Sequence, residues 1–337
     1  FFEGKMEPVI KELQEKGLLA VGKEGAKIVE FGDSAKLPPL MILKKDGATL
    51  YSTRDLATDK FRIEKYGKDV LIINEVGMEQ SLYFQQLYKV EEMLGWFKND
   101  QRVHLKHGLI RFKDGKMSTR KGNTIWLEDV LDAAVHNAKG IGVGKDLKKE
   151  WIWENGKPIG VENGLYGKGS EDKIAKQVGI GAIKWNDLKR DSKQDIMFDW
   201  DDVLNMQGNS GPYIQYVFAR TQSVIARSET TKQSVEIDRS ASLAMTDYKF
   251  EIEERELLRL LARFDEVITE AAERLAPNII CTYLFELAQA FNLFYQKCPI
   301  IKSEEDVREF RLSLTDKTGE VIKTGLNLLG IEAPSKM

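Results

Sequence analysis

Residues 69–76 read DVLIINEV, an apolar run that predicts a buried strand. A helical pattern precedes it from Arg54 to Tyr66, and another follows it from Met78 to Leu94. Further strands are predicted outside these helices, at LMIL (residues 40–43) and around Val103. Because strand and helix alternate, the pattern is typical of a parallel sheet covered by helices. The first part of the chain is therefore expected to be an α/β fold.

The loops that follow the strands are the expected place for a ligand. In open α/β sheets, ligands bind at the carboxyl ends of the strands. The loops after Tyr51, Val76 and Ile110 are therefore expected to share one cleft. The third loop leads into GKMSTRKGN at residues 115–123, a run of glycines, hydroxyls and cations.

Positive charge is concentrated around this loop, although the whole chain has a net charge of −3. The window 102–121 holds the single acid Asp114 and seven basic residues: Arg102, Lys106, Arg111, Lys113, Lys116, Arg120 and Lys121. A solvated face usually mixes signs, so the cluster indicates an anionic ligand. Hydroxyls between cations suit a loop that wraps a polyphosphate, although a basic surface loop without function is the alternative. The loop is not a Walker motif, which reads GxxxxGK[ST].

The second part of the chain is predicted to be helical. Residues 139–170 read as a glycine-rich insertion in which Asn155-Gly156 predicts a tight hairpin. Trp151 and Trp153 are expected to pack on this hairpin, and a base-stacking platform is the alternative. Helical periodicity begins at Lys173, is interrupted by a Ser/Thr-rich linker at 228–247, and continues through at least three more helices. The expected fold class is thus α/β followed by an all-α bundle.

Composition limits the class of protein. The 337 residues suggest two domains, and with 42% hydrophobic and 31% charged residues no apolar stretch reaches the ~18 residues of a membrane helix. Cys281 and Cys298 lie in apolar helical patterns, so we expect buried thiols rather than a disulfide. These features favour a cytoplasmic protein that makes no membrane contact, and a monomer is expected. The chain starts at Phe1 without a signal peptide, so it is expected to be a piece of something longer.

Several motifs resemble one enzyme family. KMSTRKGN at 116–123 resembles the KMSKS signature of class I aminoacyl-tRNA synthetases. Five further stretches resemble arginyl-tRNA synthetases in particular: YSTRDLA (51–57), VGIGAIKW (178–185), GNSGPYIQYVFAR (208–220), AFNLFY (290–295) and GLNLLGIEAPSKM (325–337). The resemblance implies the second half of a Rossmann-like nucleotide-binding sheet followed by a helical anticodon-binding bundle. It divides the chain into a partial catalytic domain (1–138), connecting helices with the hairpin insertion (139–200) and the anticodon-binding domain (201–337).

The resemblance also implies substrates: ATP with Mg²⁺ but no tightly bound protein metal, L-arginine, and tRNA(Arg). ATP would be bound by His107 and by the loop residues Lys116, Met117, Ser118, Thr119 and Arg120. Catalysis would depend on Ser118 and on three cations, Lys116, Arg120 and Lys121. Thr119 stands where the motif has its second lysine, so the cation that meets the phosphates is open. His104 and His107 lie near the implied adenine pocket, and a structural role is the alternative for both.

Arginine would be bound by three residues before this loop. Asp55 would take the substrate guanidinium, Tyr51 would help to position the arginine, and Gln80 would hold its amino-acid moiety. A carboxylate with an adjacent hydroxyl is a natural receptor for a forked cation, and the two residues are four apart at the predicted strand-to-helix junction. Complementation of the helix dipole is the alternative for Asp55, and an ordinary polar first-turn residue is the alternative for Gln80.

A tRNA surface is expected on the helical half. Tyr213, Tyr216 and Arg220 are spaced three and four apart and share a helix face. Aromatic side chains stack under splayed bases, at about 1 to 3 kcal/mol per base, and an anticodon loop offers such bases. The resemblance places Asn209, these three residues, Tyr295 and Met337 at the anticodon loop. On pattern alone Tyr295 would be a core residue.

No HIGH-type motif precedes Tyr51. We therefore expect half an active site and no arginyl-adenylate synthesis by this chain alone, which robust pyrophosphate exchange would contradict. The alternatives are a tRNA-binding module without catalysis and another class I synthetase, of the lysyl or cysteinyl type. The TRDLA and SGPYIQY stretches discriminate against the second of these.

Overall fold

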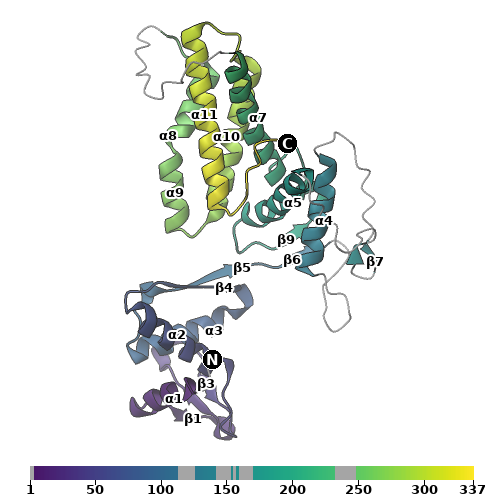
Figure 1. The fold of residues 1–337 in the computed structure, drawn as a ribbon. Helices are drawn as coiled ribbons and strands as arrows, with labels where there is room; N and C mark the ends of the chain where they lie inside the picture. The colour runs from purple at the N-terminus through teal and green to yellow at the C-terminus, as the bar shows by residue number, and fades with distance from the viewer. Residues whose placement is uncertain (1–3, 113–125, 142–152, 155–156, 159–169, 232–247) are drawn as a thin grey trace. The chain divides into compact units, whose positions relative to one another are not determined.

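The computed structural model describes residues 4–112, 126–141, 153–154, 157–158, 170–231 and 248–337. The chain divides into two compact units, one of residues 1–109 with 192–195 and the other of residues 110–191 with 196–337. Figure 1 draws the elements of both. Each unit is described by itself.

The first unit combines an antiparallel sheet, a parallel strand pair and three helices. Its elements are α1 (Met6–Glu15), β1 (Ala20–Val21), β2 (Lys27–Val29), β3 (Leu40–Leu43), α2 (Tyr51–Tyr66), β4 (Ile72–Gly77), α3 (Ser81–Leu94) and β5 (Arg102–His107). Short 3-10 turns lie at Lys23–Gly25, Asp33–Ala35, Met78–Gln80 and Asn99–Gln101. Strands β1, β2 and β3 pair antiparallel in that order, and β4 pairs parallel with β5.

The predicted β4–α3–β5 unit is confirmed, with Ile72 opposite Arg102 and Gly77 opposite His107 in the parallel register. The strand LMIL, however, forms β3 and pairs antiparallel with β2 rather than joining this pair. Its residues alternate between the core and the surface: Leu40 and Ile42 are buried, whereas Met41 is 46% exposed. Such alternation is typical of an antiparallel sheet with one covered face, whereas buried parallel strands are apolar on both faces.

Helix α2 begins at Tyr51, three residues before the predicted start. Its first turn is held by two hydroxyls: Ser52 Oγ donates to the Met41 carbonyl at 2.6 Å, and Thr53 Oγ1 donates to the Ile42 carbonyl at 2.5 Å. Both side chains are buried, so this turn is part of the core although its residues are polar. Tyr51 and Asp55 therefore lie on one helix, a turn apart, rather than across a strand-to-helix junction.

The second unit is mainly helical. Its helices are α4 (Leu127–Ile141), α5 (Ser170–Leu188), α6 (Trp200–Val203), α7 (Gly211–Thr231), α8 (Ile252–Ala262), α9 (Phe264–Glu273), α10 (Pro277–Lys297) and α11 (Glu305–Leu328). β6 (Ile110–Phe112) pairs parallel with β9 (Ile196–Phe198). β7 (Trp153–Glu154) pairs antiparallel with β8 (Lys157–Pro158), which confirms the predicted hairpin, while Trp151 and the turn residues lie outside the described residues.

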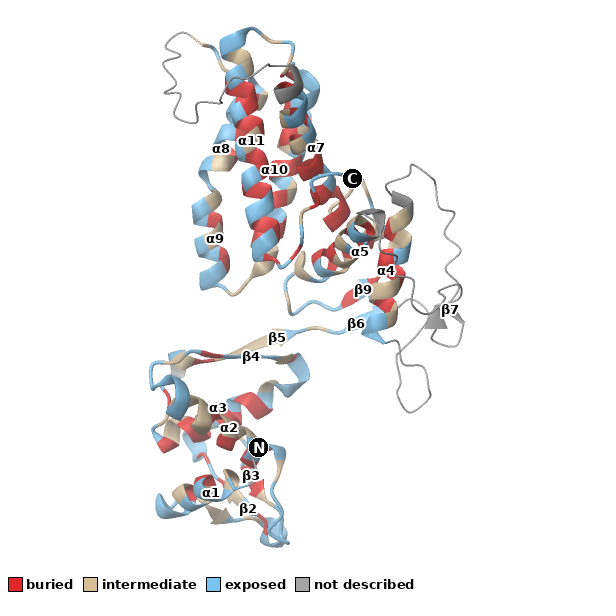
Figure 2. Cartoon of the chain, viewed as in Figure 1, coloured by how far each residue is buried: buried red, intermediate tan, exposed pale blue. Residues whose placement is uncertain are grey.

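The predicted helical bundle is also confirmed. Its core includes Trp185 from α5, Ile214 from α7, Leu257 from α8, and Leu284 and Phe291 from α10, all fully buried. Figure 2 shows the buried residues along the helix faces that meet one another. Helices α5 and α7 cross closely because Gly211 has no side chain: a Cβ there would lie 2.7 Å from the Gly181 carbonyl oxygen.

Cys281 and Cys298 are free and buried in this bundle, as predicted. Among the residues that the structure describes, no helix is long and apolar enough to cross a membrane.

Candidate functional site

The cation-rich loop falls outside the described residues, which end at 112 and resume at 126. This applies to Lys116, Met117, Ser118, Thr119, Arg120 and Lys121. Their predicted contact with ATP, and the predicted cleft shared by the three loops, therefore remain predictions.

Arg102 does not belong to the predicted anion-binding cluster. It is 7% exposed and forms ion pairs with Asp59 and with Glu91, the latter at 2.6 Å between Nε and Oε2. Its guanidinium also lies over the Tyr88 ring, 4.6 Å from the ring centroid. The arginine begins β5 and points into the core between α2 and α3, where buried carboxylates require a cation. A net charge counted over residues 102–121 does not reveal these ion pairs, because Asp59 and Glu91 lie outside that window.

The first candidate site lies on α2 and α3 of the first unit. Tyr51 is 60% exposed, and Asp55 is half-buried one turn later. The Tyr83 hydroxyl of α3 donates a hydrogen bond to Asp55 Oδ2 at 2.5 Å. The Tyr51 and Tyr83 rings meet edge to face with their centroids 4.7 Å apart. Tyr83 thus contacts Asp55 and Tyr51, two of the three residues that were predicted to bind arginine.

The electrostatics of Asp55 combine burial and hydrogen bonding. Burial raises the pKa of the Asp55 carboxyl, and the Tyr83 hydrogen bond acts in the opposite direction. Burial and the adjacent carboxylate raise the pKa of the Tyr83 phenol, which therefore stays protonated and continues to donate. The hydrogen bond fixes Oδ2, and a carboxylate has further lone pairs that can accept from a bidentate cation.

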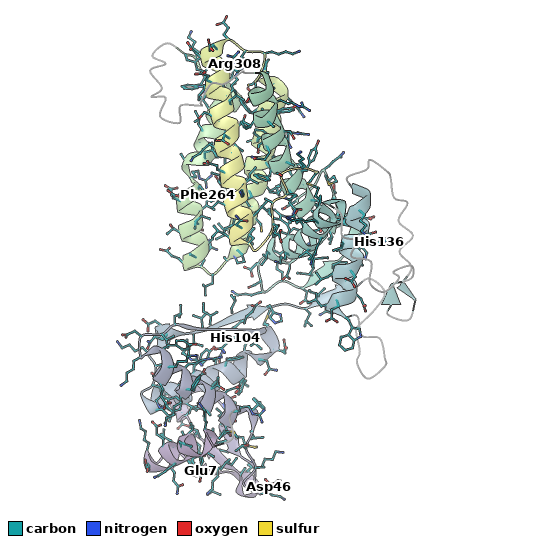
Figure 3. The ribbon with its side chains drawn as sticks, viewed as in Figure 1. Glu7, Asp46, His104, His136, Phe264 and Arg308 are labelled. Carbon is teal, nitrogen blue, oxygen red and sulfur yellow. The ribbon has the colours of Figure 1, made fainter. Side chains whose placement is uncertain are left out.

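Gln80 directly precedes α3, and His104 and His107 are residues of β5. Gln80 is exposed at the amino end of α3. His104, labelled in Figure 3, contacts the Val76 carbonyl through Nε2 at 3.0 Å and lies against the Phe84 ring, with centroids 4.5 Å apart. His107 is exposed at the end of β5, with Nδ1 2.8 Å from the Gly108 carbonyl.

The second candidate site lies on α7 and α10 of the second unit. Tyr216 and Tyr295 are 36% and 37% exposed, and the Arg220 guanidinium lies over both rings, at 4.7 and 5.2 Å from their centroids. Tyr213 is buried, but it is linked to Arg220 through Asn292. The structure thus brings together four of the six residues that were predicted to contact the anticodon loop.

The other two residues have different surroundings. Asn209 accepts a hydrogen bond from Trp185 Nε1 at 2.9 Å, so its side chain holds the start of α7 against α5. Met337 packs against a buried cluster of α4 and α5 that consists of Val135, Ala138, Ala175 and Val178.

Comparison with known proteins covers both parts of the chain. The family model "tRNA synthetases class I (R), catalytic domain" matches residues 1–200, and the model "DALR anticodon binding domain" matches residues 214–337. The chain belongs to the arginyl-tRNA synthetase family. The match favours this family over the lysyl and cysteinyl alternatives.

Similar family members extend over the whole chain. It is 36% identical over 337 residues to an arginine–tRNA ligase of Fusobacterium nucleatum and 37% identical over 339 residues to one of Halothermothrix orenii. In both comparisons it is covered completely, whereas it covers 54% of the relative. The chain therefore spans about half the length of these arginyl-tRNA synthetases.

Solved arginyl-tRNA synthetase structures share the fold. The Thermus thermophilus enzyme has a TM-score of 0.77 at 22% identity, with 99% of this chain and 58% of that chain covered. The Plasmodium falciparum enzyme has a TM-score of 0.76 at 20% identity, with 100% and 53% covered. The expected class I fold, with parallel strand pairs followed by a helical anticodon domain, is confirmed.

Sequence reasoning missed two residues of these sites, Tyr83 and Asn292. Tyr83 lies in an apolar helical pattern that predicts a core residue, and it is indeed 8% exposed. Asn292 is the polar residue within AFNLFY. An amide inside an apolar run was the available signal, because a half-buried amide requires partners.

Proposed function

We propose that the chain is the part of an arginine–tRNA ligase that selects L-arginine, closes on ATP and reads tRNA(Arg). The reaction joins the arginine carboxylate to the α-phosphate of ATP with loss of pyrophosphate. It then transfers the arginyl group to a hydroxyl of the tRNA, with AMP as the leaving group. The observation that carries the proposal is that family membership and two candidate sites occur in one chain. The first unit holds the Asp55 carboxylate, which Tyr83 orients. The second unit holds Arg220, whose guanidinium lies over a tyrosine ring.

Asp55 would select the amino acid. Its carboxylate is held by the Tyr83 hydroxyl, and Tyr51 provides an exposed ring beside it. A guanidinium can donate two parallel N–H bonds to such a carboxylate and can stack its flat charged face on an aromatic ring. An ammonium group has neither the paired donors nor the flat face. Gln80, exposed at the start of α3, would hold the amino-acid moiety.

ATP would be held by the loop 116–121 together with His107. When bound, Mg²⁺ neutralises phosphate charge and so favours departure of pyrophosphate. No group of three or more His, Cys, Asp and Glu that would hold a metal is found among the described residues. We propose that the ion arrives on the substrate phosphates, since Mg²⁺ is often bound in that way.

The tRNA anticodon loop would bind to α7 and α10. Tyr216 and Tyr295 are available to stack under bases, and Arg220 carries a positive charge between them. We include Asn209 and Met337 at the border of this surface. The free, buried cysteines accord with a reducing compartment such as the cytoplasm. A monomer is the proposed state and is checked by light scattering.

The test compares two RNAs on the 337-residue chain. A tRNA(Arg) transcript and the same transcript with a substituted anticodon are titrated in filter-binding assays at several salt concentrations. The proposal predicts tighter binding of the unmodified transcript and affinity that falls with salt, as phosphate contacts require. Equal affinity for the two transcripts would contradict anticodon reading. Binding of tRNA(Arg) without any binding of arginine would instead favour the tRNA-binding module.

A further inference from the structure

Asn292 connects two side chains of the neighbouring helix. It lies half-buried on α10, and its Nδ2 donates to the Tyr213 hydroxyl at 2.9 Å while its Oδ1 accepts from Arg220 Nη1 at 2.5 Å. Tyr213 and Arg220 are seven residues apart on α7, which is two helical turns. One amide therefore fixes two α7 side chains with both of its functional groups.

The guanidinium held in this way is positioned for a ligand. Arg220 Nη2 donates to the Tyr216 hydroxyl at 2.8 Å, and the Tyr216 and Tyr295 rings lie at its faces. Two of its five N–H groups are thus used. No carboxylate of the described residues pairs with it. A cation that is oriented by neutral partners keeps its charge for an external anion or acceptor, and it loses less side-chain freedom on binding.

Tyr213 contributes a second donor. Its oxygen accepts the hydrogen bond from Asn292, and no acceptor for its own proton is found in the described part of the chain. Burial raises the pKa of the Tyr213 phenol, so it stays protonated. Its ring is fixed by edge-to-face contact with Phe285, at 5.8 Å between centroids.

We propose that Asn292 is a positioning residue that holds the Tyr213 hydroxyl and the Arg220 guanidinium as a pair of donors for acceptor atoms of a single-stranded RNA loop. This rests on the proposed function, because the ligand is the anticodon loop of the same tRNA. Asn292 acts through its two neighbours and does not itself contact the RNA.

The first experiment measures tRNA(Arg) binding by the 337-residue chain after Asn292→Leu, which keeps the branched outline of the side chain at a larger volume and removes both hydrogen bonds. We expect affinity to fall about tenfold, because two donors lose their orientation. The matched control is Asn278→Leu on the same helix, fourteen residues or about 21 Å away along its axis. The control is expected to bind as the parent does, and thermal unfolding confirms that both variants fold. Asn292→Ala replaces the leucine variant if that variant unfolds.

Two further readouts separate positioning from a structural role. In a chain that already carries Arg220→Met, Asn292→Leu should reduce tRNA(Arg) affinity by less than it does in the parent chain. The remaining loss of affinity is the part that acts through Tyr213. In the ¹⁵N-arginine-labelled chain, the Arg220 Nε–H resonance should be resolved in the parent and averaged after Asn292→Leu.

The inference is wrong if Asn292→Leu leaves tRNA affinity unchanged, or if its effect is undiminished in the Arg220→Met chain. Failure of the proposed function has a different signature. In that case the parent chain itself would not distinguish tRNA(Arg) from the transcript with a substituted anticodon.

Discussion

Asp55 is the residue on which the proposed arginine site depends. Its carboxylate is half-buried and held by Tyr83, so it is ready to accept from a cation without first being ordered. The same burial raises the pKa of Asp55, which makes its charged form costly in the free protein.

The first prediction concerns Asp55→Asn. It should abolish arginine binding by the chain, because a neutral amide does not compensate a guanidinium, and it should leave the free energy of unfolding at neutral pH unchanged or higher. Asp69→Asn, at an exposed carboxylate just before β4, is the matched control. Titration calorimetry with L-arginine and urea unfolding measure the two effects. Retained arginine affinity in Asp55→Asn would exclude this carboxylate as the receptor.

A second prediction concerns pH. Arginine binding requires the ionised carboxylate, so affinity should fall as the pH falls through the raised pKa of Asp55. Tyr83→Phe removes a hydrogen bond that lowers this pKa, so the loss of affinity should begin at a higher pH in the variant than in the parent. Calorimetric titrations across a pH series compare the two midpoints. Coincident midpoints would contradict the role of Tyr83.

The buried cluster beneath this site gives a third prediction. Burial and the neighbouring Asp59 charge raise the pKa of the Glu91 carboxyl well above its usual range, although Arg102 lies against it and Arg62 pairs with Asp59. A raised pKa means that the folded state holds a proton more tightly than the unfolded state. Stability contributed by Glu91 is therefore present below its unfolded pKa and is lost as the pH rises toward the folded value.

Glu91→Gln should remove this dependence. Relative to the parent, the variant should gain free energy of unfolding as the pH rises from about 4.5, the usual range of a glutamate, to 8. Urea unfolding at several pH values measures the difference, with the exposed Glu64→Gln as the control. A constant difference between parent and Glu91→Gln across this range would show that Glu91 does not titrate there.

At the scale of elements, the periodic segments were predictable and their edges were not. Helix α3 and strand β4 follow directly from apolar periodicity. The start of α2 was missed because Ser52 and Thr53 are polar, and only the tertiary structure reveals that carbonyls of β3 accept their hydroxyls. The antiparallel pairing of β3 was missed for a related reason: four residues do not show which strand they will meet.

The site residues divide in the same way. The spacing of Tyr213, Tyr216 and Arg220 predicted a shared face, and all three now belong to one network with Tyr295. The partners of Tyr83 and Asn292 were not predictable, because these contacts join helices that are distant in sequence. The amide within AFNLFY signals only that Asn292 has some partner. Arg102 was misassigned because its two carboxylate partners lie on other elements.

A fourth prediction tests the start of α2. Thr53→Val keeps the shape of the side chain but leaves the Ile42 carbonyl without its donor, and it should lower the free energy of unfolding by about 1 to 2 kcal/mol. Because Tyr51 and Asp55 lie on the same first turns, arginine affinity should also fall. Thr58→Val, whose hydroxyl bonds within the helix to the Arg54 carbonyl at an exposed position, is the control and should have a smaller effect on both quantities.

At the scale of the whole molecule, the two proposed binding sites belong to different units. The first unit holds the proposed arginine site and the second holds the proposed anticodon surface. The two family models divide the chain elsewhere, because the catalytic-domain model extends to residue 200, within the second unit. The chain spans about half the length of the arginine–tRNA ligases that it matches.

The most direct measurement titrates the 337-residue chain with L-arginine and, separately, with L-citrulline, in the presence of tRNA(Arg) and ATP. Citrulline has nearly the same shape but carries a neutral urea group in place of the guanidinium. We predict that arginine binds, that citrulline does not bind, and that Asp55→Asn abolishes the difference. Equal binding of the two amino acids, or arginine binding that survives Asp55→Asn, would contradict selection of a forked cation by this carboxylate.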